Sequence, residues 1–362
     1  MPDFIPGLKL SELFYSEAAK PILETFFPQL SHSAALLGWG SEVLGYDTVQ
    51  SSDHHWGPRF FLFLSPQDYK EHKNSIHETL RLNLPHRFKG YSTSFGEPDE
   101  AGVRHLTETE SGPINHMIHI ETIEGFFGWY LGCNPYEPVT VADWLLFSSH
   151  KLLGVTSGKV FHDGLGELEE TRRKFQYYPR DVWLYQLVAQ WIKIFEDREF
   201  ISRCGDVGDE LGSMVVAAHQ VKKLMHLCFL MERRYAPYTK WFGTAFSELE
   251  CGPELGPIFK DALLSLTWKE RESNLARAYR VIARMHNALK ITPPIVEDVS
   301  GYYGRPYIVF EPPELLGDIM NCFTDEEVKA IKHGLGSVNQ FVDSTNQLSN
   351  IPLVRMFKAI YK

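Results

Sequence analysis

The chain has few cysteines, and they show no pairing pattern. Of its 362 residues only five are cysteines, an odd number, and no two of them have the C-x-x-C spacing. Disulfide frameworks and thiolate zinc sites depend on such patterns, so neither is expected. A reducing compartment fits this composition best, and we expect a cytoplasmic protein.

Long apolar runs and excess basic charge are also missing. No stretch approaches the run of about 20 apolar residues that a membrane span requires, so no membrane association is expected. Lys and Arg number 36 against 46 Asp and Glu, which gives a formal net charge of -10. Because Lys and Arg drive binding along a nucleic-acid backbone, a broad nucleic-acid footprint is not expected, whereas a local nucleotide pocket is compatible with this charge.

Apolar residues, by contrast, are abundant enough for a large core and two domains, since 44% of the chain is hydrophobic. In the N-terminal part, apolar residues at helical spacing predict a helix over Leu10–Phe27. Short apolar runs predict buried strands at Ala34–Leu37 and Arg59–Leu64, and Ser65 with Pro66 is typical of the start of the next helix.

The stretch GPINHMIHIETI alternates between apolar and polar residues, which predicts a half-buried strand. One predicted face carries Ile114, His116, Ile118 and Ile120, and the other carries Asn115, Met117, His119 and Glu121. We expect the second set to form a polar working face.

After about Gly125 strand signals nearly vanish and helical periodicity takes over. Long helices are predicted at Asp181–Phe195, Gly212–Arg234 and Lys269–Leu289, and a capping box at Thr324–Glu327.

The fold class expected is therefore α+β, with a mixed sheet and its helices in residues 1–125 and a mainly α-helical domain in 126–292. Residues 293–362 are expected to form a C-terminal extension packed on the helical domain.

Between the first two predicted strands lie a Gly-Ser turn and an Asp-His-His cluster. Gly40 allows close backbone approach and Ser41 is a favoured helix cap, so a strand, this turn and a short helix can present N–H groups to a phosphate. Asp53 and His55 are two residues apart in an extended segment, so their side chains leave one face and could hold a metal ion. This order is typical of nucleotidyltransferases, in which a turn grips a triphosphate and carboxylates hold Mg²⁺. The alternative is that these residues cap local structure and the histidines satisfy buried carbonyl groups.

Five blocks of sequence closely resemble an uncharacterised bacterial family called domain of unknown function 4037, within the nucleotidyltransferase-like group. They are GSEVLGYDTVQSSDHHWGPR, VFHDGLGEL, YYPRDVWLYQLVAQW, RCGDVGDELGS and ERRYAPYTKWFGTAF. The resemblance extends from about Phe4 to Tyr307 and implies an N-terminal nucleotidyltransferase-like fold followed by a helical domain. It also implies that Gly40, Ser41 and Asp53 are the matching motif positions.

The chain departs from the resembled pattern at His55, where the motif normally has a second carboxylate. Mg²⁺ prefers oxygen ligands, whereas a neutral imidazole suits softer ions such as Mn²⁺, so the identity of the divalent ion stays open between the two. The third acid of such a fold lies on a neighbouring strand, and Glu121 is the carboxylate in that register. A surface glutamate at a strand end is the equally weighted alternative.

Cations and aromatic residues also alternate in ERRYAPYTKWFG, at the end of a long predicted helix. Arg233 and Lys240 are candidates for nucleotide binding, because cations and aromatic rings suit a phosphate and a base. The alternative is that the aromatic residues pack the two domains together while the cations form ion pairs.

These patterns lead to two hypotheses of function. The first is a nucleotidyltransferase that moves a nucleoside monophosphate from an NTP to an unknown hydroxyl-bearing acceptor, with Asp53 and Glu121 catalytic. The second is a catalytically weak or inactive nucleotide-binding or regulatory protein of the same fold, which the missing acid at His55 favours.

Overall fold

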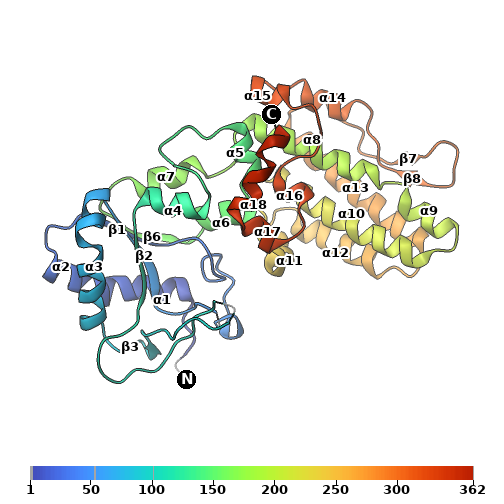
Figure 1. Cartoon of the computed structure of the whole chain (residues 1–362). Helices are drawn as coiled ribbons and strands as arrows, with labels where there is room; N and C mark the ends of the chain where they lie inside the picture. The colour runs from blue at the N-terminus through green and yellow to red at the C-terminus, as the bar shows by residue number, and fades with distance from the viewer. Residues whose placement is uncertain (1–2, 53, 101, 362) are drawn as a thin grey trace. The chain divides into compact units, whose positions relative to one another are not determined.

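The computed structural model describes residues 3–52, 54–100 and 102–361 (Figure 1). It divides into two compact units, of which the first comprises Met1–Val139 with Lys151–Gln176 and the second comprises Thr140–His150 with Tyr177–Lys362. The division differs from the expected boundary at residue 125, because a strand far beyond that residue completes the sheet of the first unit.

The first unit is built on a mixed four-stranded sheet of order β5-β2-β1-β6. β1 pairs antiparallel with both β2 and β6, whereas β2 and β5 run parallel. The strands are β1 (His32–Leu36), β2 (Arg59–Leu64), β5 (Met117–Glu121) and β6 (Lys159–Asp163). The expected α+β class is confirmed, but one strand of the sheet, β6, lies well beyond Gly125, in the part of the chain where strand signals nearly vanish. β6 was not predicted from the sequence, because its residues are only partly buried and do not form a continuous apolar run.

Helices cover both faces of this sheet (Figure 1). On one face Phe60, Leu62 and Leu64 of β2 enter a core shared with α1 and α3. On the other face Phe61 and Phe63 of β2 pack against Phe126 of α4. The remaining elements of the unit are α1 (Gly7–Phe14), a π-helical turn (Tyr15–Ala19), α2 (Lys20–Phe26), a 3₁₀ turn (Val49–Ser51), α3 (Pro66–Asn83), β3 (Arg87–Phe88), β4 (Tyr91–Ser92), α4 (Ile123–Tyr130) and α7 (Leu168–Lys174).

The helix predicted at Leu10–Phe27 is present but is interrupted by the π-helical turn just before Pro21. Proline has no N–H group, so a regular α-helix would lose a hydrogen bond at this point, and a local widening accommodates the loss. The predicted start of α3 is confirmed, because the Ser65 hydroxyl accepts the Asp68 N–H at 3.1 Å.

The second unit is mainly helical, and its three longest helices match the predicted segments within three residues at each end. It contains α5 (Val141–Leu146), α8 (Arg180–Glu196), α9 (Phe200–Asp206), α10 (Glu210–Met231), α11 (Thr239–Ser247), α12 (Gly252–Leu264), α13 (Trp268–Leu289), β7 (Ser300–Gly301), β8 (Ile308–Val309), α14 (Leu315–Met320), α15 (Glu326–Ala330), α16 (Val338–Phe341), α17 (Thr345–Ser349), α18 (Ile351–Met356) and a final 3₁₀ turn (Phe357–Tyr361). Helix α6 (Ser149–Thr156) crosses the division between the units.

The capping box expected at Thr324–Glu327 is wrong by one residue. Asp325 is the N-cap of α15, and its carboxylate accepts the Glu327 N–H at 2.8 Å. Thr324 instead donates its hydroxyl to Asp181 of α8 at 3.1 Å, which holds the start of α15 against the long helix. No helix in the described part of the chain combines the length and the apolarity needed to cross a bilayer.

Buried histidines make the stability of the first unit depend on pH. Burial lowers the pKa of His116 from 6.5 to about 4. Between these values the unfolded chain binds the proton and the folded chain does not, so the free energy of unfolding falls as the pH drops. For His116 alone the loss amounts to about 2 kcal/mol between about pH 7 and about pH 5.

We therefore expect His116→Gln to flatten the pH dependence of stability, measured by urea denaturation at both pH values. The control is His72 of α3, whose side chain is 42% exposed, and His72→Gln should keep the wild-type slope. An unchanged slope in His116→Gln would contradict this assignment.

Candidate functional site

The turn that follows β1 lies at one end of the sheet. Because β1 and β2 are antiparallel, the turn is next to the start of β2. Gly38 and Gly40 have φ angles of 88° and 120°, and the Tyr46 N–H donates to the Ser41 carbonyl at 2.9 Å. Residues 41–45 form this closed turn in place of the expected short helix, so Ser41 is not a helix cap. After Gly45 the chain leaves the turn and runs to the start of α1, where the Asp47 carboxylate accepts the Gly7 N–H at 2.6 Å.

Beneath the turn lies a buried ion pair, whose side chains are only 1% (Arg59) and 4% (Glu42) exposed. Arg59 Nε donates to Glu42 Oε1 at 2.9 Å, Nη2 donates to the same oxygen, and Nη2 also reaches the Trp39 carbonyl at 2.7 Å. A Cβ at position 40 would collide with both partners, so the pair explains the requirement for Gly40. Sequence reasoning missed this pair, although an arginine at the head of an apolar strand was a visible signal.

Removing one partner of this ion pair should strongly lower the free energy of unfolding. In Glu42→Gln the Arg59 guanidinium would stay buried without a counter-charge, and we expect a loss of about 3–5 kcal/mol in the free energy of unfolding. Denaturant unfolding of Glu42→Gln and of the double variant Glu42→Met/Arg59→Met measures the effect. The double variant should be less destabilised than the single one, and the reverse order would contradict the role given to the pair.

His55 lies near two cations, Arg59 and Arg104, whose charges act on its ring. Its backbone adopts a left-handed conformation with φ 50°, and its N–H donates to the Arg104 carbonyl at 3.0 Å. The pKa of His55 is lowered, first by burial and then by the charges of Arg59, His54, Arg104 and His105. A neutral imidazole is therefore favoured at this position.

These surroundings bear on the predicted metal site. Within residues 3–52, 54–100 and 102–361, no three His, Cys, Asp or Glu side chains come together as metal ligands. Asp53 itself lies outside the described residues. The cations around His55 do not suit Mg²⁺, which needs oxygen ligands, so the described residues do not fit that ion. Binding of Mg²⁺ or Mn²⁺ by Asp53 and His55 stays a prediction.

Glu121 and the turn occupy opposite ends of the sheet. Glu121 pairs with Phe63 near the end of β2, whereas the turn is level with Arg59 at its start. Four residues of strand separate the two levels, which is about 13 Å. The Glu121 carboxylate instead accepts the Thr122 N–H at 2.9 Å, at the start of α4. The structure thus does not bring Glu121 together with Gly40 and Ser41.

Next to Glu121, the edge strand β5 borders a pocket of about 400 Å³ in the first unit. The alternation predicted for this strand is confirmed, because Ile118 and Ile120 belong to the core while His119 stacks on Phe61, with ring centroids 5.1 Å apart. The pocket is lined by Phe61, Lys73, Asn74, His77, Ile118, His119, Ile120, Glu121 and Trp129. His119 and Trp129 were not singled out from the sequence as binding residues.

Arg233 and Lys240 belong to the second unit, whereas Gly40 and Ser41 belong to the first. Arg233 follows the end of α10 with φ 52°, and its guanidinium carbon lies 4.3 Å from the centre of the Trp183 ring. Lys240 Nζ lies 4.8 Å from the centre of the Trp241 ring. Both cations therefore contact aromatic side chains within their own unit, and their part in nucleotide binding stays a prediction.

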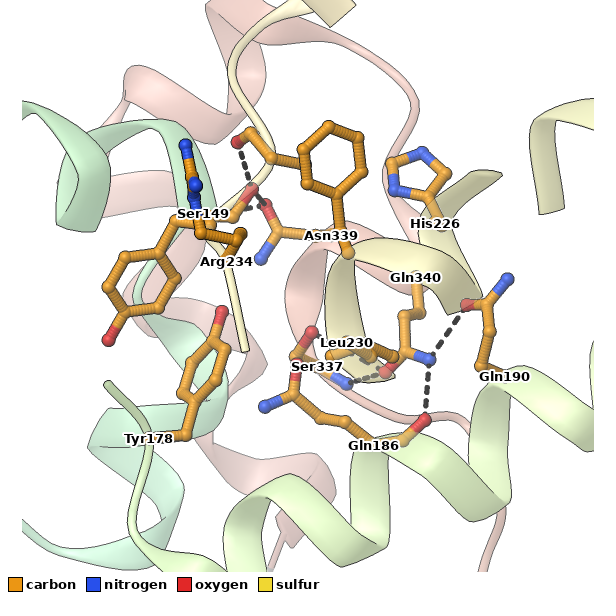
Figure 2. A pocket seen from close by; sticks show the side chains of 13 residues that line it. Ser149, Tyr178, Gln186, Gln190, His226, Leu230, Arg234, Ser337, Asn339 and Gln340 are labelled. Carbon is orange, nitrogen blue, oxygen red and sulfur yellow. Dashed lines mark hydrogen bonds between the residues drawn. The ribbon is translucent and has the colours of Figure 1, made fainter. Parts of the chain in front are cut away.

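A second pocket, in the helical unit, is small and is lined by both polar and apolar side chains (Figure 2). Gln340 Nε2 donates to the Gln186 carbonyl and to Gln190 Oε1, both at 3.0 Å, and Ser149 donates its N–H to Asn339 at 3.0 Å. The pocket has a volume of about 30 Å³. That is room for one or two water molecules only, so the pocket is too small for a metabolite.

Taken together, these features define an α+β protein with a glycine turn above a buried ion pair, followed by a helical unit. The family described as "Domain of unknown function (DUF4037)" matches residues 144–242. The resemblance inferred from the sequence is thus confirmed over part of the span from Phe4 to Tyr307. The chain also aligns with a nucleotidyltransferase-like protein from Exiguobacterium sibiricum, with a TM-score of 0.31, 10% sequence identity, and coverage of 84% of this chain and 99% of that one. No curated protein matches the chain.

Proposed function

We propose that the first unit binds a nucleoside triphosphate, with the phosphates held at the turn formed by residues 38–45. The observation that carries the proposal is the position of Arg59 under this turn. Its Nη1 is buried and has no hydrogen-bond partner among the described residues. The positive φ angles of Gly38 and Gly40 allow the backbone to approach a ligand closely, and backbone N–H groups with a nearby guanidinium suit a phosphate.

Transfer of the nucleoside monophosphate to a hydroxyl-bearing acceptor is the second candidate. The resemblance of Gly40, Ser41 and Asp53 to a nucleotidyltransferase motif supports it. The cations around His55 and the distance of Glu121 from the turn weigh against it, because such transfer uses carboxylates that hold divalent metal ions. We therefore rank nucleotide binding, with weak or absent catalysis, above transfer.

Nucleotide binding predicts thermal stabilisation by ATP, GTP, CTP or UTP, because a ligand that binds the folded state raises its stability. The gain is about 2.7 kcal/mol at 100 times the dissociation constant. Each nucleotide is compared alone, with Mg²⁺ and with Mn²⁺.

Gly40→Ala should abolish most of the stabilisation, since a Cβ there meets Glu42 and Arg59, and Ser41→Ala should weaken it without unfolding the unit. The matched control is Gly256→Ala in α12, where a Cβ meets no atom within 4 Å. Absence of a shift with all four nucleotides in the wild-type protein would refute the proposal.

The variant His55→Asp distinguishes nucleotide binding alone from nucleotidyl transfer. If the phosphates lie near the cations around His55, His55→Asp should weaken tripolyphosphate binding in the presence of a chelator by about 1 kcal/mol, or about fivefold. His72→Asp on α3 is the charge-matched control, and calorimetry measures both variants. Tightening of Mg²⁺-dependent NTP binding in His55→Asp, on the order of 10–100-fold, would instead favour a metal site and transfer.

A further inference from the structure

The pocket beside β5 lies outside the turn that is proposed to bind the phosphates. Its size and its lining residues are those of a small-molecule site. Its volume of about 400 Å³ falls in the range of about 300–1,000 Å³ that is usual for small-molecule sites. Two of its walls are aromatic, namely Phe61 and Trp129. Trp129 is 45% exposed, so part of its ring is accessible to a ligand.

The other walls supply neutral and charged hydrogen-bonding groups. His119 Nε2 is buried and has no hydrogen-bond partner within the part of the chain that the structure describes. Burial lowers the pKa of His119 to about 4, so the ring is a neutral hydrogen-bonding group at physiological pH. Asn74 adds an amide, and Glu121 adds a carboxylate whose Oε1 accepts one backbone N–H. Aromatic walls with several donors and acceptors suit a planar heterocycle.

Trp39 connects this pocket with the turn. It stands between Gly38 and Gly40, and its ring centroid lies 5.5 Å from that of His119 and 5.4 Å from that of Trp129. The Arg59 guanidinium lies 5.4 Å from the centre of the same ring. Trp39 therefore contacts both the guanidinium beneath the turn and two residues that line the pocket.

We propose that the pocket lined by Phe61, His119 and Trp129 holds the base of the bound nucleotide, stacked on Trp129 and hydrogen-bonded to the polar groups of β5 and α3. This inference rests on the proposed function, because it takes the phosphates to lie at the turn. It adds a base-binding site made of residues outside the Gly-Ser and Asp-His-His motifs.

The test compares ligands with and without a base. Calorimetry measures binding of inorganic tripolyphosphate and of each of the four NTPs to the full chain and its variants. Trp129→Ala should weaken the best-bound NTP by about tenfold or more, because loss of a stacking ring costs that much, and should leave tripolyphosphate affinity unchanged. His119→Asn should have the same direction of effect. Tyr136→Ala removes another exposed aromatic ring of the first unit, one outside this pocket, and should change neither affinity.

The possible outcomes test the base-binding site separately from the proposed function. Equal NTP affinity in Trp129→Ala and wild type would place the base elsewhere, while tripolyphosphate binding would preserve the proposed function. An equal loss for NTP and tripolyphosphate in a folded variant would also overturn the base site, because the ring would then act on the phosphates. No binding of either ligand to the wild-type protein would overturn the proposed function together with this inference. Circular dichroism of each variant shows that it is folded.

Discussion

The buried pair of Arg59 and Glu42 is the constraint on which the candidate site depends. A guanidinium taken out of water must keep its counter-charge, so Glu42 has to turn inward immediately after the glycines. That inward turn fixes the path of residues 38–45, and the Trp39 carbonyl is fixed by the same guanidinium. The backbone of the turn is also held by the rest of the first unit, because the Gly38 N–H donates to the Gly154 carbonyl at 2.9 Å.

The sheet then determines what can meet at the turn. Since β1 is antiparallel and β5 parallel to β2, the start of β5 lies level with Arg59, while Glu121 lies at the far end. His119 lies between these two levels, opposite Phe61 and on the same face of the sheet. Among the described residues, the groups next to the turn on this face are thus aromatic rings, an imidazole and a guanidinium that is paired with the Glu42 carboxylate. Such a set is compatible with the proposed binding of a nucleotide.

Local patterns in the sequence predicted those features that depend on neighbouring residues. The bounds of β2, the Ser65 cap and the alternation of β5 follow from side-chain burial and capping, and all three are present. Strand direction and register were not accessible in this way. The pairing of Glu121 with Phe63, the addition of β6 to the sheet and the ion pair between Glu42 and Arg59 join residues that are distant in the chain. The sequence predicted the position of the Gly-Ser turn, but it did not predict which residues surround the turn.

In the proposed binding mode, one face of the sheet in the first unit binds a nucleotide from the turn to the pocket beside β5. A crystal structure of the protein with a non-hydrolysable NTP and Mg²⁺ tests it most directly. We expect phosphate oxygens within hydrogen-bonding distance of backbone N–H groups in residues 38–45, and the base against Trp129. A nucleotide bound only in the second unit, around Arg233 and Lys240, would contradict it.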